Sequence, residues 1–268
     1  MKTRAVTGFF FVGVMLASVL LGAYAFTLFF LVLSGLCTEE FYRLVTTSEV
    51  RPQKRWGLVL VISIYLPLTM HLFQGEPFIN MLICVPITIM IIVAELYRKY
   101  PNPFHNISYT LFGVVFAAVP FCFFYATAFI DGTYSYHYPL AFLLLLWSSD
   151  TGAYIFGVKL GKHRLFERHS PKKTWEGFAG GMVTSMLAAF IISSYFDELS
   201  LVQWLGMAVI IVTAGTLGDL SESMLKRSLS TKDSGSLLPG HGGLLDRFDG
   251  LLLAAPLVFV YLQFIRTF

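Results

Sequence analysis

Long apolar runs alternate with short polar segments along the chain. An α-helix needs about 20 apolar residues to cross the hydrocarbon core of a bilayer, so such runs predict membrane-spanning helices. The first run, 1–36, suits two spans with a break near Gly22. Further spans are predicted at 56–73, 78–95, 108–130, 138–158, 175–195, 201–227 and 245–265, which makes about nine in all.

Local residues refine this outline. The second span runs on into Glu39 and Glu40, which predicts a helix end that projects into water. Pro86 predicts a kink in the fourth span. Three glycines at the start of the seventh span predict a close helix contact: Gly177, Gly180 and Gly181.

Composition supports a membrane protein. Hydrophobic residues make up 56% of the 268 residues and charged residues only 13%, whereas soluble domains carry about 25%. Mean hydropathy is +0.70. We therefore expect an all-α polytopic membrane protein. The three cysteines lie inside apolar runs without a CxxC or histidine partner, which favours core packing over disulfides or metal ligation: Cys37, Cys84 and Cys122.

The placement of basic residues predicts the topology. With the N-terminus inside and the spans alternating, every one of the 19 Lys and Arg residues except Arg266 falls on the cytoplasmic side. The C-terminus is then outside. The cationic start before an apolar run also fits a cleaved signal peptide, but the run continues, which favours a retained span. We expect one integrated membrane domain, with helices in 1–135 and a catalytic part in 136–268 whose cytoplasmic loops are 159–174 and 227–245.

Polar side chains gather on the last two predicted helices. In the eighth they stand at i, i+3, i+4 and i+7, which is one helix face: Asp219, Glu222, Ser223 and Lys226. In the ninth, Asp246 and Asp249 are also one turn apart. Carboxylates without cysteine suit Mg²⁺, so the predicted metal ligands are Asp219, Glu222, Asp246 and Asp249. An interfacial belt of helix caps and ion pairs is the alternative, but it explains one or two charges rather than this density.

The loop between these helices contains Pro239-Gly-His-Gly-Gly243. Its glycines let backbone N–H groups approach phosphate oxygens. A second polar cluster begins at Asp150, inside the sixth span, where a carboxylate is costly unless it is functional; an interhelical hydrogen bond is the alternative.

A basic loop follows the sixth span. It contains Lys159, Lys162, Lys172, Lys173 and Thr174. Ordinary positive-inside charge would explain these lysines. However, the order Ser170-Pro-Lys-Lys-Thr174 sets a rigid turn, two cations and a hydroxyl at a helix start, which favours a phosphate site. Carboxylates, lysines and a glycine loop together predict polyphosphate chemistry, and at a membrane surface the second substrate is most simply a lipid. No Walker A, protein-kinase or GxGxxG sequence is present.

These residues resemble the bacterial phosphatidate cytidylyltransferase (CDP-diacylglycerol synthase) family. Its signature is Ser-x-apolar-Lys-Arg, four residues, Lys-Asp-x-Gly, then Pro-x-His-Gly-Gly-apolar-x-Asp-Arg-apolar-Asp. This chain matches it with Ser223, Lys226, Arg227, Lys232, Asp233, Gly235, Pro239, His241, Gly242, Gly243, Asp246, Arg247 and Asp249. The earlier Asp150-Thr-Gly-Ala-Tyr154 and Ser170–Gly177 blocks are similar as well. The likeness covers roughly 147–249, and the first five spans match only in hydropathy.

The resemblance implies a Mg²⁺-dependent nucleotidyltransferase of phospholipid biosynthesis. It would convert CTP and phosphatidate to CDP-diacylglycerol and pyrophosphate in the inner membrane, with the active site toward the cytoplasm. It also implies a homodimer, leaves room for a second metal ion, and gives no reason to expect a nucleic-acid partner. The expected catalytic residues are Asp219, Asp246, Lys226 and His241. The expected substrate-binding residues are Asp150, Lys172, Lys173, Thr174, Ser223, Arg227, Lys232, Gly242, Gly243 and Arg247.

Two rival functions remain open from the residues alone. A nucleotide-dependent lipid kinase would need a similar carboxylate site, but it would release a nucleoside diphosphate. A cation transporter could use Asp150 and Asp219 as an ion path, but it leaves the Pro-Lys-Lys and His-Gly-Gly segments unexplained.

Overall fold

The computed structural model describes residues 2–235 and 242–267, with side chains from Thr7 onward. The chain forms two compact units. The first comprises Met1–Tyr134 and Asp233–Arg247, and the second comprises Ser135–Lys232 and Phe248–Phe268. The predicted site residue His241, and Pro239 beside it, lie outside the described residues.

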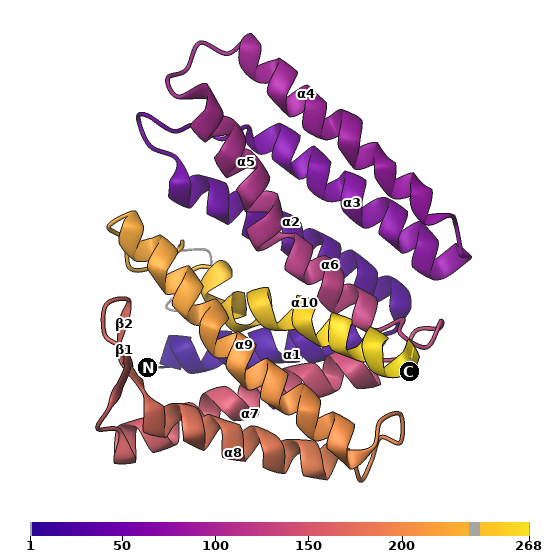
Figure 1. Cartoon of the computed structure of the whole chain (residues 1–268), viewed down its shortest axis with the longest axis vertical. Helices are drawn as coiled ribbons and strands as arrows, with labels where there is room; N and C mark the ends of the chain where they lie inside the picture. Colours follow the sequence, from indigo (N-terminus) through magenta and orange to yellow (C-terminus); the bar gives the residue numbers. More distant parts are fainter. Residues whose placement is uncertain (1, 236–241, 268) are drawn as a thin grey trace. The chain divides into compact units, whose positions relative to one another are not determined.

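The first unit is built on helix α2. Its elements are α1 (Lys2–Leu20), α2 (Ala23–Val45), α3 (Lys54–Gln74), the 3₁₀ helix η1 (Phe78–Ile83), α4 (Cys84–Leu96), α5 (Pro103–Ala117) and α6 (Val119–Thr127). Helix α2 packs against α3, α5 and α6 (Figure 1). The predicted break near Gly22 is confirmed, since Gly22 has a φ of 97°, a conformation that glycine adopts readily.

Two predicted spans differ in detail from the expectation. The fourth begins as η1 and becomes α-helical at Cys84, so Pro86 lies in the first turn of α4, where a proline is tolerated, rather than at a kink. The fifth is interrupted at Ala118, between α5 and α6. Pro120 in the first turn of α6 lacks the N–H that a continuous helix would use, which accounts for the interruption.

The second unit contains α7 (His137–Leu160), β1 (Arg164–Phe166), β2 (Ser170–Thr174), α8 (Trp175–Ile192), α9 (Leu201–Ser228) and the part of α10 (Leu245–Thr267) from Phe248 onward. Helices α7 and α8 form its most extensive pair. The close contact predicted from the glycines is confirmed: a Cβ on Gly180 would lie 2.3 Å from Cγ of Phe156, and one on Gly181 would lie 2.9 Å from the Ser149 carbonyl oxygen.

The segment between α7 and α8, predicted as an irregular loop, is an antiparallel hairpin. Arg164 pairs with Thr174, and Phe166 pairs with Ser170. The hairpin extends from the end of the α7–α8 pair (Figure 1). Pro171 fixes an extended backbone for the residue before it, which suits a strand. The prediction of an all-α fold is therefore correct apart from this short sheet.

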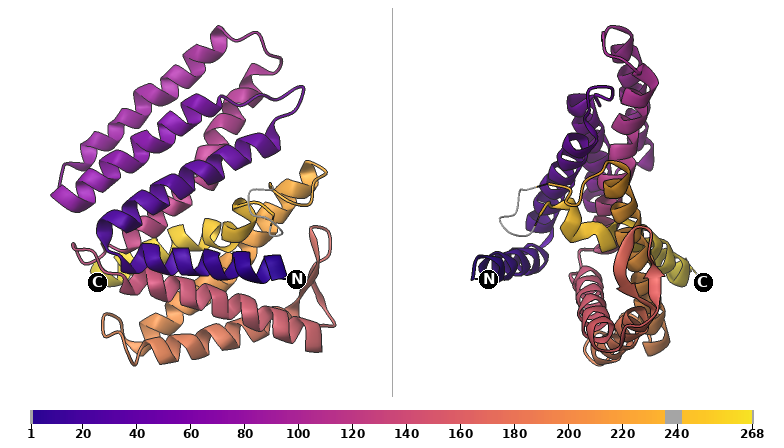
Figure 2. Two further views of the ribbon diagram at one scale, coloured as in Figure 1. Left: turned by 180° about the vertical axis from the view of Figure 1, so that it is seen from behind. Right: turned by 90° about the vertical axis from the view of Figure 1, so that its left-hand side faces the viewer.

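Helices of membrane-spanning length dominate the described residues. Eight of their segments are long and apolar enough to cross a bilayer: Ala23–Val45, Lys54–Gln74, Phe78–Leu96, Pro103–Thr127, His137–Leu160, Trp175–Ile192, Leu201–Ser228 and Leu245–Thr267. In α1 the apolar stretch Thr7–Leu20 is shorter. Helices α3 and α4 lie side by side (Figure 2). A polytopic membrane protein is confirmed, while nine spans and the N-in, C-out orientation stay predictions.

Candidate active site

The second unit contains a pocket of about 370 Å³ that is lined by apolar and charged residues together. Its walls come from α7, the hairpin, α8, α9 and α10. Charged side chains on four of these elements line it: Asp150, Lys172, Lys173, Asp219 and Asp249. Both polar clusters identified in the sequence therefore contribute to one cavity, although about 70 residues separate them along the chain.

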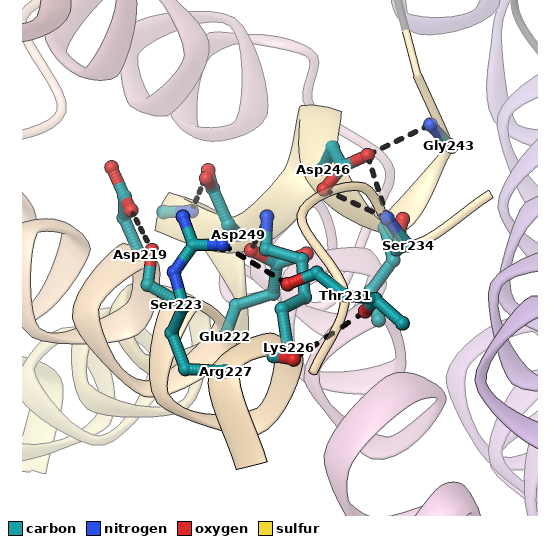
Figure 3. Close-up of polar contacts among 12 residues, drawn as sticks. Asp219, Glu222, Ser223, Lys226, Arg227, Thr231, Ser234, Gly243, Asp246 and Asp249 are labelled. Carbon is teal, nitrogen blue, oxygen red and sulfur yellow. Dashed lines mark hydrogen bonds and ion pairs between the residues drawn. The ribbon is translucent and has the colours of Figure 1, made fainter. Parts of the chain in front are cut away.

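Two of the lining side chains form an ion pair. Lys173 Nζ is 2.6 Å from Asp219 Oδ2, which joins the hairpin to α9. On the other oxygen, Asp219 Oδ1 accepts a hydrogen bond of 3.2 Å from the Ser223 hydroxyl one turn later (Figure 3). Asp219 is also near enough to Asp150 and Asp249 for their charges to interact. The pocket thus combines three carboxylates with two lysines.

Asp150 faces the pocket without a structural partner. Its residue is exposed, and no hydrogen bond or ion pair joins its carboxylate to another residue in the described ranges. In the described part of the chain, Asp150 therefore does not make the interhelical hydrogen bond that was the alternative explanation. A carboxylate retained on a membrane helix without such a bond is typical of a functional group.

Glycines bring α9 and α10 into backbone contact beside the pocket. A Cβ on Gly218 would lie 2.3 Å from the Asp249 carbonyl oxygen, and one on Gly215 would lie 3.5 Å from the Gly250 carbonyl oxygen. Asp249 Oδ1 accepts a 2.6 Å hydrogen bond from the Gly250 N–H. This close approach places the Asp249 carboxylate at the same cavity as Asp219.

The junction of the hairpin with α8 is fixed by two side chains. Thr174 is the N-cap of α8, and its Oγ1 accepts a 3.1 Å hydrogen bond from the Gly177 N–H. Glu176 accepts from the Lys162 N–H at 3.1 Å and contacts His163 Nδ1 at 2.6 Å. These bonds direct Lys172 and Lys173 to the pocket, while Lys159 and Lys162 are exposed outside its lining.

Further along α9, Glu222 and Lys226 form a buried ion pair. Glu222 has no exposed surface, and neither residue lines the pocket. These two predicted site residues therefore bind each other among the packed helices and do not face the pocket. Arg227 is exposed and donates a 3.0 Å hydrogen bond to the Thr231 carbonyl oxygen (Figure 3), and Lys232 and Arg247 are exposed as well.

In the first unit, Asp246 joins the backbone at Ser234 to the backbone at Gly243, just before α10. Its Oδ2 accepts from the Gly243 N–H at 2.8 Å and from the Ser234 N–H at 3.1 Å (Figure 3). Gly242 has a φ of 82° and approaches Asp246 so closely that a Cβ would lie 2.6 Å from Oδ2. The proposed sharing of a metal ion between Asp219 and Asp246 stays a prediction.

Glu40 is the residue that the sequence reasoning missed. It was expected at a helix end in water, but only 7% of its surface is exposed. Its carboxylate accepts from the N–H groups of Leu244 and Leu245, both at 2.9 Å, and from the Ser234 hydroxyl at 2.6 Å. Glu40, on α2, therefore caps the start of α10. The neighbouring Glu39 forms an exposed ion pair with Arg43, so the local sequence does not indicate that Glu40 is buried.

The arrangement of possible ligand side chains can be compared with what Mg²⁺ requires. Within residues 2–235 and 242–267, no three Asp, Glu, His or Cys side chains are arranged as a ready-made metal cage. Mg²⁺ does not require one, because it usually binds one or two carboxylates together with substrate phosphates and water. Asp219 and Asp249, at one pocket beside two lysines, fit this mode.

Sequence comparison places the chain in a known class. A model of the cytidylyltransferase family matches residues 2–265, and the chain belongs to this family. Among curated relatives, the phosphatidate cytidylyltransferase of Staphylococcus haemolyticus is 34% identical over 98% of this chain and 99% of its own length. The enzyme of the same name from Bacillus subtilis is 31% identical over 98% of this chain and 97% of its own length.

Proposed function

We propose that this protein transfers the cytidylyl group of CTP to phosphatidate, giving CDP-diacylglycerol and pyrophosphate. The observation that carries the proposal is the pocket in which Lys173 and Asp219 pair beside Asp150 and Asp249, in a chain of the cytidylyltransferase family. Lysines suit a triphosphate, and carboxylates suit the cation that accompanies it.

In this reaction a phosphate oxygen of phosphatidate attacks the α-phosphorus of CTP. The bond from the α-phosphorus to the bridging oxygen breaks, and pyrophosphate carries away the electron pair. Lys172 and Lys173 bind the phosphates and stabilise the charge that gathers on the leaving group. Because Lys173 pairs with Asp219, an incoming polyphosphate competes with this carboxylate for the lysine.

Asp219 and Asp249 are the residues that would hold Mg²⁺ here, with Asp246 as a further candidate ligand. Bound Mg²⁺ would neutralise phosphate charge and orient the reacting groups. The phosphate monoester of the lipid is already ionised near neutral pH, so no strong base is needed to activate it.

The lipid substrate would enter between α7 and α9. Apolar residues of both helices line the pocket next to its charged groups: Leu146 on α7, and Ile211 and Val212 on α9. A surface that is apolar beside cations suits a lipid whose phosphate must reach the nucleotide. The charge distribution supports an active site toward the cytoplasm, and a homodimer belongs to the same proposal.

The decisive experiment supplies the purified full chain with phosphatidate and each of the four nucleoside triphosphates, and measures pyrophosphate and lipid product. Pyrophosphate and CDP-diacylglycerol with CTP are expected. Release of a nucleoside diphosphate would identify a lipid kinase instead, and ion flux in vesicles without nucleotide would identify a transporter. Asp197→Asn, an exposed change in the turn after α8 and outside the pocket, is the control and should leave the rate unchanged.

A further inference from the structure

The first unit holds a second pocket, of about 640 Å³, which the proposed reaction does not use. It is lined by residues of two basic segments that lie more than 40 residues apart in sequence, around the start of α3 and the end of α4. Four cationic side chains line it: Arg51, Lys54, Arg55 and Arg98. The fold thus concentrates positive charge from two loops at one cavity.

One of these cations is committed to the protein. Arg98 Nη1 is 2.7 Å from the buried Glu95, and Arg98 Nη2 donates to the Arg51 carbonyl oxygen at 2.9 Å. The Arg98 and Arg51 guanidinium carbons lie 4.7 and 5.2 Å from the centre of the Tyr100 ring. The ring therefore orients both guanidinium groups at the pocket wall.

The remaining cations lack a protein counter-ion. Within the described part of the chain, no carboxylate is within ion-pair distance of Arg51, Lys54 or Arg55. Lys54 and Arg55 also occupy the first turn of α3, which contains no acidic residue, so the positive end of the helix dipole adds to their charge. Positive charge gathered in this way attracts an anion.

A buried side chain gives an independent indication of a ligand. Gln53 lines the pocket with 5% of its surface exposed. Its Nε2 donates to Glu95 and to the Ile91 carbonyl oxygen, but its Oε1 accepts no hydrogen bond from the described residues. A buried acceptor of this kind is usually satisfied, and a small shift that exposes Oε1 to the pocket would let a donor such as a headgroup hydroxyl complete it.

The surroundings indicate a lipid. Trp56 lines the pocket at the start of the membrane helix α3, the position where tryptophan marks the bilayer interface. On α4, which contributes Ala94 to the lining, the apolar side chains of Ile92 and Leu96 are 46% and 79% exposed. We propose that this pocket binds the phosphate-containing headgroup of an anionic phospholipid, distinct from the substrate, with its acyl chains along α3 and α4.

Native mass spectrometry of the detergent-solubilised full chain tests this, with titrations of dioleoyl phosphatidylglycerol and dioleoyl phosphatidylcholine. We expect preferential binding of phosphatidylglycerol, weakened at least about tenfold in Arg51→Gln/Arg55→Gln, because each cation near the headgroups adds to the attraction. The matched control is Arg43→Gln/Lys99→Gln, which removes the same charge from exposed residues outside the lining. It should bind as the unmodified protein does.

Three results would overturn the proposal. They are equal losses in both double variants, equal binding of phosphatidylcholine, and displacement of the lipid by millimolar inorganic phosphate, which would indicate a site for free phosphate. Lys173→Gln, in the other pocket, should leave this binding unchanged whether or not the proposed reaction is correct. Turnover of Arg51→Gln/Arg55→Gln in neutral detergent should match that of the unmodified protein, which shows that the variant is folded.

Discussion

Lys173 on β2 and Asp219 on α9 are joined by an ion pair of 2.6 Å in the lining of the pocket of the second unit. In the proposed reaction this lysine would bind the triphosphate, and the carboxylate would hold the lysine until the nucleotide binds. We expect Lys173→Gln to raise KM for CTP by about tenfold or more, since a charge-assisted contact to phosphate is lost. Steady-state rates against CTP concentration measure this. Lys162→Gln, exposed and outside the lining, should leave KM unchanged, and an equal rise there would contradict the assignment.

Asp150→Asn separates function from stability. The carboxylate accepts no hydrogen bond from the described residues and faces the pocket, so the amide should cost little folding free energy. Turnover should fall by about a hundredfold, the size typical of a lost electrostatic contact at a reacting centre. Thermal unfolding in detergent and pyrophosphate release, measured on the same preparation, give the two values. A lower melting temperature with normal turnover would assign Asp150 to structure.

The Mg²⁺ dependence of pyrophosphate release tests Asp219 and Asp249 one at a time. Chelation by EDTA should abolish pyrophosphate release, and added Mg²⁺ should restore it. In Asp219→Asn and Asp249→Asn we expect a higher Mg²⁺ concentration for half-maximal rate, because a ligand charge has been removed.

Asp246→Asn then distinguishes its two roles. Its carboxylate accepts from the backbone at Ser234 and Gly243, which gives it a structural task. A changed Mg²⁺ requirement would identify Asp246 as a ligand. An unchanged Mg²⁺ requirement with lower stability would show that Asp246 acts by holding the backbone at Ser234 and Gly243.

Glu40→Ala should weaken the structure at Ser234, Leu244 and Leu245, although these residues are about 200 positions away in sequence. Two backbone N–H groups and one hydroxyl lose a charged acceptor, and buried donors left unpaired cost about 1–3 kcal/mol each. We expect a loss of about 3 kcal/mol in unfolding free energy and faster hydrogen exchange at Leu244 and Leu245. Glu39→Ala, in an exposed pair with Arg43, should change stability by less than about 0.5 kcal/mol.

Gly243→Ala tests the same contact from the other side. A Cβ there would lie 2.1 Å from both Glu40 Oε1 and Ser234 Oγ, so one of these groups would have to move. We expect lower stability and lower turnover. Gly13→Ala in α1 is the matched control, because no atom lies within 4 Å of the added carbon and alanine favours a helix. Equal effects at the two positions would contradict the crowding argument.

The sequence predicts most of the helices because hydrophobic length is a strong signal. It also singles out Asp150, Lys173, Asp219 and Asp249, which the structure places at one pocket, since charge inside or beside an apolar run is unusual. It fails at Glu40, because a glutamate at the end of a span is equally typical of a helix leaving the membrane. Its burial depends on Leu244 and Leu245, which are distant in sequence.

The hairpin escapes prediction for a different reason. Arg164–Phe166 and Ser170–Thr174 are too short and too polar to show an alternating strand pattern. The pairing of Glu222 with Lys226 could be anticipated from their i, i+4 spacing, but their burial away from the pocket could not. A helical face indicates which residues lie together, and the packing of neighbouring helices decides which part of that face lines a cavity.

The contact of Glu40 with the start of α10 also has a consequence for biosynthesis. The ribosome completes α2 long before it reaches Leu244 and Leu245, so Glu40 is synthesised well before the N–H groups that it binds. A fragment that begins at α7 would contain the whole family signature but would lack Glu40. Co-expression of the two halves as separate chains should therefore restore a protein that neither half can form alone.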